Sequence, residues 1–120
     1  MKAKPYSVLV CGGRDYRGRT AVFEALDRLA RQQNIGLIIN GGATGADEFA
    51  AQWARSRAIP FLTHPADWEK HGKAAGPVRN AQMLKMWEPD FVLAFPGGRG
   101  TESMVALAEE HGFPVGRVGW

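Results

Sequence analysis

The sequence predicts an α/β fold in which a five-stranded, mainly parallel sheet is covered by helices on both faces. Segments with strand-like and helix-like apolar patterns alternate along the whole chain of 120 residues. The strand-like segments are apolar almost without interruption, as is typical of strands that are buried on both faces. The length leaves room for one hydrophobic core, so residues 1–120 are expected to form a single domain.

Five strands are expected, at residues 6–11, 35–39, 59–62, 91–95 and 115–118. Helices are expected between them, because apolar residues recur at helical spacing within 20–32, 46–54, 78–88 and 104–111. Thr44 and Asp47 fit a capping box at the start of the second helix. Pro89 should end the third helix. Residues 65–77 show no periodicity and are expected to form a loop.

The connections between the strands predict where a ligand would bind. Right-handed crossovers favour the strand order 3-2-1-4-5, with the first two helices on one face and the last two on the other. The winding then reverses between the first and fourth strands. Ligands of open parallel sheets bind at such a point, outside the carboxyl ends of the strands. The glycine pairs at 12–13 and 97–98 should therefore face each other across a crevice.

Composition and charge exclude several classes of protein. Apolar residues make up 45% and charged residues 22%, close to globular averages, so disorder is not expected. No apolar run is long enough for a transmembrane helix, and no signal peptide is recognised. Cys11 is the single cysteine, which excludes a disulfide framework and fits a reducing cytoplasm. Neither a metal, a cofactor nor a nucleic-acid partner is predicted, because the three histidines form no zinc pattern and the net charge of +3 is scattered.

The positions of the glycines predict a phosphate-bearing ligand. Gly-Gly pairs follow three strands, at residues 12–13, 41–42 and 97–98. Glycine lets a backbone approach a ligand closely, and the N–H groups at a helix N-terminus favour phosphate. Tight turns would explain any one pair, but three pairs at one edge of a sheet favour a ligand. Neither the P-loop nor the GxGxxG motif fits, so an ordinary NAD dehydrogenase or P-loop NTPase is not expected.

Residues 96–101, PGGRGT, are similar to the PGGxGT motif of the LOG-type phosphoribohydrolases. Further motifs are GGRD at 12–15, GGATGAD at 41–47, ADW at 66–68 and GKAAGPVRN at 72–80. Together they resemble the SLOG superfamily of Rossmann-like nucleotide-binding domains, and most closely its small YspA/cpYpsA-related branch. The resemblance implies a nucleotide or nucleotide-derived ligand, but it implies no particular reaction.

The resemblance to the hydrolases is incomplete. They carry PGGxGTxxE, and Met104 stands here in place of the glutamate. Their other active residue, an arginine on the helix before the fourth strand, is matched by Arg79. Glu102 lies two residues before Met104, about 200° around the helix, and should point away. Binding or sensing of a nucleotide is therefore favoured, and cleavage of the N-glycosidic bond of a nucleoside 5'-monophosphate is the alternative.

The candidate ligand-binding residues lie in the glycine loops, in the 65–77 segment and on the third helix. Arg79 fits a phosphate or ribose clamp, and the arginines within the loops fit phosphate contacts. Trp68 fits either stacking on a base or packing that pins its loop. Asp47 fits a cap better than a ligand contact, and Asp15 fits either a ribose contact or a partner for Arg14. No catalytic residue is assigned, and the full set is Gly12, Gly13, Arg14, Asp15, Gly41, Gly42, Thr44, Asp47, Trp68, Arg79, Asn80, Gly97, Gly98, Arg99, Gly100 and Thr101.

The third predicted helix carries more apolar surface than one sheet face would cover. Its apolar residues span roughly 220° of the circumference, against a stripe of about 100° on an ordinary surface helix. They are Ala81, Met83, Leu84, Met86 and Trp87. The 65–77 loop would cover the surplus in one arrangement. We expect a homodimer instead, as the resemblance to LOG-type proteins also implies.

Overall fold

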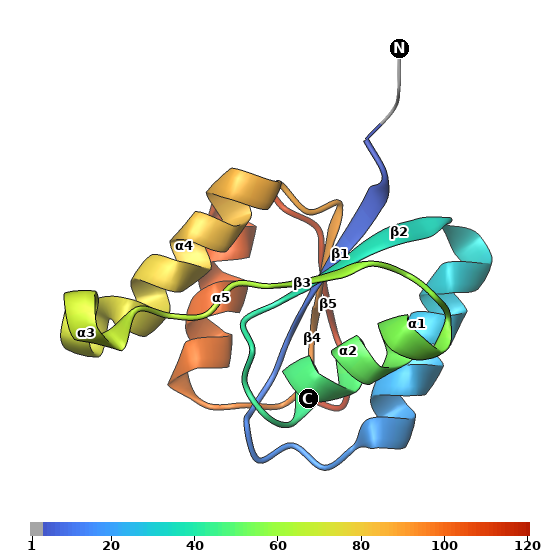
Figure 1. Ribbon diagram of the computed structural model, residues 1–120, viewed down its shortest axis with the longest axis horizontal. Helices are drawn as coiled ribbons and strands as arrows, with labels where there is room; N and C mark the ends of the chain where they lie inside the picture. The colour runs from blue at the N-terminus through green and yellow to red at the C-terminus, as the bar shows by residue number, and fades with distance from the viewer. Residues whose placement is uncertain (1–3) are drawn as a thin grey trace.

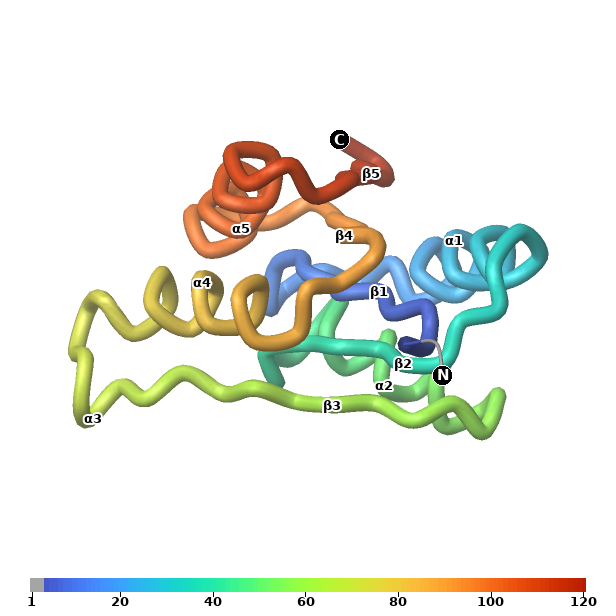
Figure 2. The backbone as a smooth tube through the Cα atoms, turned by 90° about the horizontal axis from the view of Figure 1, so that it is seen from above, coloured from blue at the N-terminus to red at the C-terminus, as the bar shows by residue number. Residues whose placement is uncertain are grey.

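The computed structural model describes residues 4–120 and contains the five-stranded parallel sheet that the sequence predicts. Its strands are β1 (Tyr6–Cys11), β2 (Ile35–Asn40), β3 (Phe61–Thr63), β4 (Phe91–Ala94) and β5 (Val115–Arg117). They lie in the order β3-β2-β1-β4-β5, and each pair of neighbours is parallel (Figure 2). The predicted fold class and strand order are confirmed.

Helices cover the two faces of the sheet in pairs, as Figure 1 shows. α1 (Arg19–Gln32) and α2 (Ala46–Ser56) pack on one face, and α4 (Ala75–Trp87) and α5 (Arg99–Glu110) on the other. Successive side chains of a strand point to opposite faces, so β1 contributes Val8 and Val10 to the first apolar cluster and Leu9 to the second. None of the helices within residues 4–120 is both long and apolar enough to cross a bilayer.

The segment expected to be a loop at 65–77 is largely helical, so that expectation is wrong. It contains α3 (Trp68–His71) and the 3₁₀ turn η1 (Gly72–Ala74), and α4 begins at Ala75, three residues earlier than predicted. The Asp67 carboxylate accepts a hydrogen bond of 3.0 Å from the Lys70 backbone N–H and so caps α3. Pro77 lies in the first turn of α4, where the N–H that proline lacks would have no partner within the helix.

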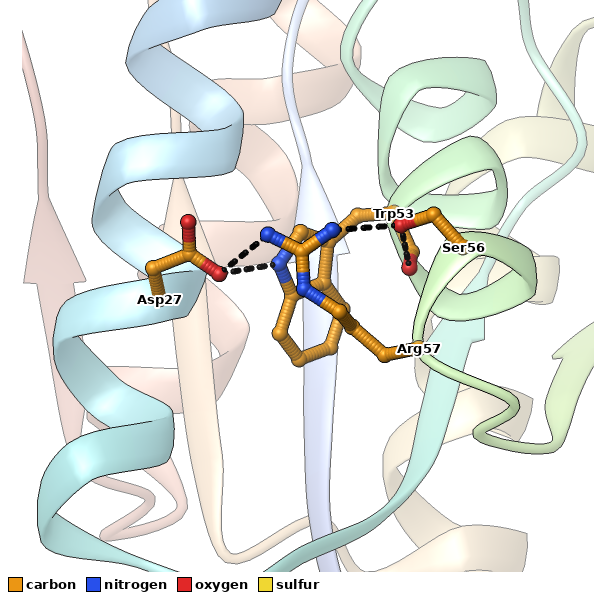
Figure 3. Close-up of polar contacts among 4 residues, drawn as sticks. All are labelled: Asp27, Trp53, Ser56 and Arg57. Carbon is orange, nitrogen blue, oxygen red and sulfur yellow. Dashed lines mark hydrogen bonds and ion pairs between the residues drawn. The ribbon is translucent and has the colours of Figure 1, made fainter.

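A polar network fastens α2 to α1 at the end far from the carboxyl edge of the sheet (Figure 3). The buried Trp53 ring donates from Nε1 to Asp27 Oδ1 at 2.9 Å, and Arg57 Nη2 pairs with the same oxygen at 2.7 Å. The Trp53 hydrogen bond, followed by Arg57, lowers the pKa of the Asp27 carboxyl. The other end of α2 lies beside the end of β1, where a Cβ atom on Gly12 would be 2.6 Å from the Ala46 Cβ.

Candidate functional site

A cleft with a volume of about 670 Å³ lies outside the carboxyl ends of β1, β2 and β4. This is the edge of the sheet at which the sequence predicts a ligand. The structure places all of the predicted site residues along the cleft except Gly42, Thr44 and Trp68. Those that line it are Gly12, Gly13, Arg14, Asp15, Gly41, Asp47, Arg79, Asn80, Gly97, Gly98, Arg99, Gly100 and Thr101.

At the base of the cleft, the loops after β1 and β4 are in direct contact. The Gly13 N–H donates to the Pro96 carbonyl at 2.9 Å. A Cβ atom added to Gly97 would lie 2.6 Å from the Gly13 nitrogen, and one added to Gly13 would lie 3.1 Å from the Gly97 Cα. The two loops therefore meet as expected, and Gly13 and Gly97 are required by this contact between backbones.

The N-terminus of α5 borders the cleft, and no side chain of residues 4–120 caps it. Gly98 precedes the helix and offers no side-chain cap, and the first hydrogen bond within the helix runs from the Glu102 N–H to the Gly98 carbonyl at 3.0 Å. The N–H groups before Glu102 are thus left for another acceptor. A Cβ atom added to Gly98 or Gly100 would meet no atom within 4 Å. The packing of the protein itself therefore does not require glycine at these two positions.

The loop between β2 and α2 is organised by the Asp47 carboxylate. Asp47 is buried, and its Oδ2 accepts hydrogen bonds from the backbone N–H groups of Gly41 at 2.9 Å and Ala43 at 3.2 Å. Burial raises the pKa of Asp47 to about 6, while these two hydrogen bonds and the nearby Arg79 guanidinium act to lower it.

The capping box expected at residues 44–47 does not form. Gly45 precedes α2 and no side chain caps the helix. The Thr44 hydroxyl donates instead to the Arg14 carbonyl at 2.8 Å. Gly45 adopts a φ of +74°, and the carbonyl oxygens of Gly13 and Arg14 approach it where a Cβ would stand. This close approach joins the β1–α1 and β2–α2 loops and directs Thr44 away from the start of the helix.

Arg79 on α4 connects the two sides of the cleft. Its Nη1 donates to the Gly41 carbonyl at 2.9 Å and to the His64 carbonyl at 3.4 Å, and its Nε donates to Asn80 Oδ1 at 3.0 Å. The Asn80 amide in turn donates to the Gly100 carbonyl at 3.1 Å, in the first turn of α5. Within residues 4–120, Arg79 Nη2 makes no hydrogen bond, so it is available to a ligand.

The positively charged guanidinium of Arg79 is partly buried. Burial lowers the pKa of the guanidinium, and the negative charge of Asp47 raises it. Among the described residues, the two side chains do not approach within the 4.0 Å of an ion pair. Arg79 and Asp47 are instead joined through the Gly41 peptide, whose N–H is held by Asp47 and whose carbonyl is held by Arg79.

Several residues that line the cleft are missing from the predicted set. Tyr16 lies in the β1–α1 loop with its ring 5.5 Å from that of Phe95, centre to centre. Its position between Asp15 and Gly18 was a signal in the sequence that could have identified it. Cys11 is buried and also borders the cleft. Burial raises the pKa of Cys11 to about 12, so the thiol stays protonated and is a poor nucleophile.

Trp68 is a predicted site residue that does not line the cleft. It belongs to α3, is 58% exposed and is not part of the cleft. Figure 2 shows α3 at one extreme of the molecule, at the end of the chain that leads from β3. A Cβ atom on Gly76 would lie 3.9 Å from the Trp68 ring, so Trp68 stands against the first turn of α4.

Comparisons with known proteins agree with this fold. The model of a family described as "YspA, cpYpsA-related SLOG family" matches residues 6–71. The "Gene 61 protein" of Mycobacterium phage D29 is 42% identical over 117 residues, which cover 90% of this chain and 92% of that protein. The structure of the molybdenum cofactor binding protein from Rippkaea orientalis is similar with a TM-score of 0.71 and 22% identity, over 98% of this chain and 77% of that one. DNA processing protein A from Streptococcus pneumoniae has a TM-score of 0.52 and 14% identity, over 92% of this chain and 58% of that one.

Proposed function

Because this chain belongs to the YspA, cpYpsA-related SLOG family, we propose that it binds a nucleotide or nucleotide-derived molecule in the cleft. The phosphate would lie at the N-terminus of α5, and the glycine-rich loops after β1, β2 and β4 would surround the rest. A volume of about 670 Å³ is within the range of small-molecule sites.

The observation that carries this proposal is the open space beside Gly98 and Gly100. Glycine is a poorer helix former than alanine, and Gly100 is the second residue of α5. Apart from its neighbours along the chain, a Cβ atom at either position would meet no atom of residues 4–120 within 4 Å. A ligand that places its phosphate against the backbone N–H groups explains why the chain keeps glycine there.

Positive charge near this helix end supports a phosphate. Arg99 begins α5 and is exposed at the cleft, and Arg79 Nη2 is available from the opposite wall. Guanidinium groups form strong, charge-assisted hydrogen bonds with phosphate oxygens. The helix dipole adds a favourable partial positive charge at the same place.

The test compares two glycines at the same position of two helices. Gly100 is the second residue of α5, and Gly76 is the second residue of α4 and lies outside the cleft. Binding of AMP and of ribose 5-phosphate would be measured by calorimetry for the wild type, Gly100→Ala and Gly76→Ala. We expect Gly100→Ala to bind at least about tenfold more weakly, a loss of 1.4 kcal/mol or more. The free energy of unfolding of both variants should equal that of the wild type or exceed it by up to about 1 kcal/mol.

Equal affinity of Gly100→Ala and the wild type would contradict the position of the phosphate. If the wild type binds neither probe, a wider panel that includes other nucleotides and the molybdenum cofactor decides whether the ligand class is wrong. The cofactor belongs in that panel because the structural relative from Rippkaea orientalis binds it.

Hydrolysis of the N-glycosidic bond is the second candidate, and the placement of the acids disfavours it. Cleavage passes through an oxocarbenium-like state that needs a carboxylate nearby. Met104 is buried where the LOG-type hydrolases have glutamate, and Glu102 is exposed and does not line the cleft. We expect wild-type protein to release no free base from AMP, as followed by chromatography, and Glu102→Gln to bind AMP unchanged. Release of adenine that Glu102→Gln abolishes would contradict the binding function.

We also infer that α4 contributes to a homodimer. Met83 and Leu84 are buried, and the Trp87 indole N–H donates to His64 Nδ1 at 3.4 Å, so the chain after β3 covers part of the helix. Met86, however, remains 61% exposed. Light scattering at tens of micromolar protein should give the mass of a dimer, and Met86→Glu should shift it toward that of a monomer. A monomeric wild type at that concentration would overturn this inference.

A further inference from the structure

Asp47 has one carboxylate oxygen that the protein does not use. Its Oδ2 accepts both backbone hydrogen bonds of the β2–α2 loop, from Gly41 and Ala43. Its Oδ1 makes no hydrogen bond with any of residues 4–120. The polar side-chain atoms of these residues that are sealed from solvent without a partner are Ser7 Oγ and Asn40 Nδ2, and Asp47 Oδ1 is not one of them. Asp47 lines the cleft, and its free oxygen is therefore open to solvent at a residue that borders the cleft.

The groups around Asp47 leave this oxygen for a ligand. Within residues 4–120, Arg79 and Asp47 do not form an ion pair, and the arginine Nη1 donates to the carbonyls of Gly41 and His64. The Cys11 thiol is protonated and buried, and it offers at most a weak hydrogen bond. A carboxylate accepts hydrogen bonds and repels anions. This part of the cleft therefore favours a hydrogen-bond donor on the ligand over a phosphate.

Asp47 and the place proposed for the phosphate border the same cleft and are connected through the protein. A chain of hydrogen bonds runs from Asp47 through the Gly41 peptide to Arg79, and from Arg79 through Asn80 to the Gly100 carbonyl in α5. Asp47 and the start of α5 are thus separated by the side chain of Arg79 and its neighbour. In a nucleotide, the donors nearest to the phosphate are the ribose hydroxyl groups, whereas the amino group of a base lies beyond the sugar.

We propose that Asp47 is a specificity-determining residue whose Oδ1 accepts hydrogen bonds from the ribose hydroxyl groups of the ligand. The proposal rests on the proposed function, because it needs a phosphate at α5. Cationic and N–H groups then lie at the end of the cleft that would hold the phosphate, and a carboxylate lies at the end that would hold the sugar. A ligand that lacks the hydroxyl groups leaves the carboxylate unpaired in a site closed to part of the solvent, which costs affinity.

The experiment uses AMP and 2',3'-dideoxy-AMP as probes, which differ only in the ribose hydroxyl groups. The wild type should bind AMP at least about tenfold more tightly than the dideoxy compound, as expected for loss of hydrogen bonds to a charged acceptor. Asp47→Asn keeps an oxygen for the N–H groups of Gly41 and Ala43 and replaces the free oxygen by an NH₂ donor. This variant should bind the two probes with affinities within about twofold to threefold of each other.

Glu48→Gln is the matched control, because Glu48 is the next residue of α2 and is exposed. It should keep the discrimination of the wild type. If the wild type binds both probes equally well, the role of Asp47 is wrong while the proposed binding function stands. If the wild type binds neither these probes nor any other nucleotide of the wider panel, the proposed function fails, and this inference fails with it. The wild-type comparison decides the question even if Asp47→Asn does not fold.

Discussion

The β2–α2 loop and the β4–α5 loop both contain a Gly-Gly pair and follow the two neighbours of β1 in the sheet, but they use their polar groups differently. In the β2–α2 loop, Asp47 accepts from the N–H groups of Gly41 and Ala43, and Asn40 Oδ1 accepts from the Gly42 N–H at 2.8 Å. In the β4–α5 loop no side chain caps the helix, and Gly98 and Gly100 border empty space.

The glycines of the two loops therefore have different causes. A Cβ atom on Gly41 would overlap with Arg79 Nη1, so glycine there makes room for a side chain of the protein. Gly98 and Gly100 make room for no other group in the part of the chain that the structure describes. The comparison teaches that a Gly-Gly pair after a strand has a structural role where the backbone N–H groups of its loop donate to side chains of the same protein. It is a candidate recognition element where they do not.

Removal of the Asp47 side chain should have the largest effect. Asp47→Ala leaves the N–H groups of Gly41 and Ala43 without their acceptor, and we expect it to lower the free energy of unfolding by about 2–4 kcal/mol. Arg99→Ala in the other loop removes an exposed side chain and should change stability by less than about 0.5 kcal/mol. Urea unfolding of both variants measures the contrast. Equal effects would mean that the two loops do not differ as described.

Arg79→Ala should affect both loops, because Arg79 contacts Gly41 directly and reaches Gly100 through Asn80. If Arg79 holds the phosphate, AMP binding should weaken by about 1.5–3 kcal/mol, the value of a hydrogen bond to a charged group. Calorimetry gives this value, with Lys85→Ala as a control from an exposed position of the same helix. Unchanged AMP affinity in folded Arg79→Ala would remove Arg79 from the binding site.

The smallest expected effect is a change in the free energy of unfolding with pH, which Asp47 in the β2–α2 loop should cause. Burial raises the pKa of Asp47 to about 6 in the folded protein. The N–H groups of Gly41 and Ala43 and the charge of Arg79 act to lower this pKa, and the neighbouring Cys11 thiol is protonated. The unfolded carboxyl has a pKa near 4, so the folded state binds the extra proton between about pH 4 and pH 6. Stability contributed by Asp47 should thus fall as the pH rises through this window, by about 1–2 kcal/mol.

Asp47→Asn removes the titrating group and serves as the reference for this experiment. The free energy of unfolding of the wild type and of Asp47→Asn would be measured in urea at pH 4, 5, 6 and 7. As the pH rises, the wild type should become less stable relative to Asp47→Asn. A constant difference would show that Asp47 titrates at its ordinary value and is not desolvated.

Much of the arrangement could be predicted because its causes are local or general. The periodicity of apolar residues indicates the strands and the longer helices, and the handedness of parallel connections favours the order β3-β2-β1-β4-β5. That order brings the glycines after β1 and β4 together, and the Gly13 to Pro96 hydrogen bond is the result. The helix in residues 68–74 was missed because four-residue and 3₁₀ turns are too short to show a period.

By itself, then, the sequence determined the layers, the strand order and the edge of the sheet at which the loops gather. Only the tertiary structure decided which loop stays open. Thr44 and Asp47 have the spacing of a capping box, but Asp47 is used by the buried N–H groups of Gly41 and Ala43, and Thr44 by the Arg14 carbonyl. Gly41 and Arg79 are 38 residues apart and meet only in the folded chain. A local pattern shows which donors and acceptors are present, whereas the partner of each buried polar atom depends on segments that the fold brings together.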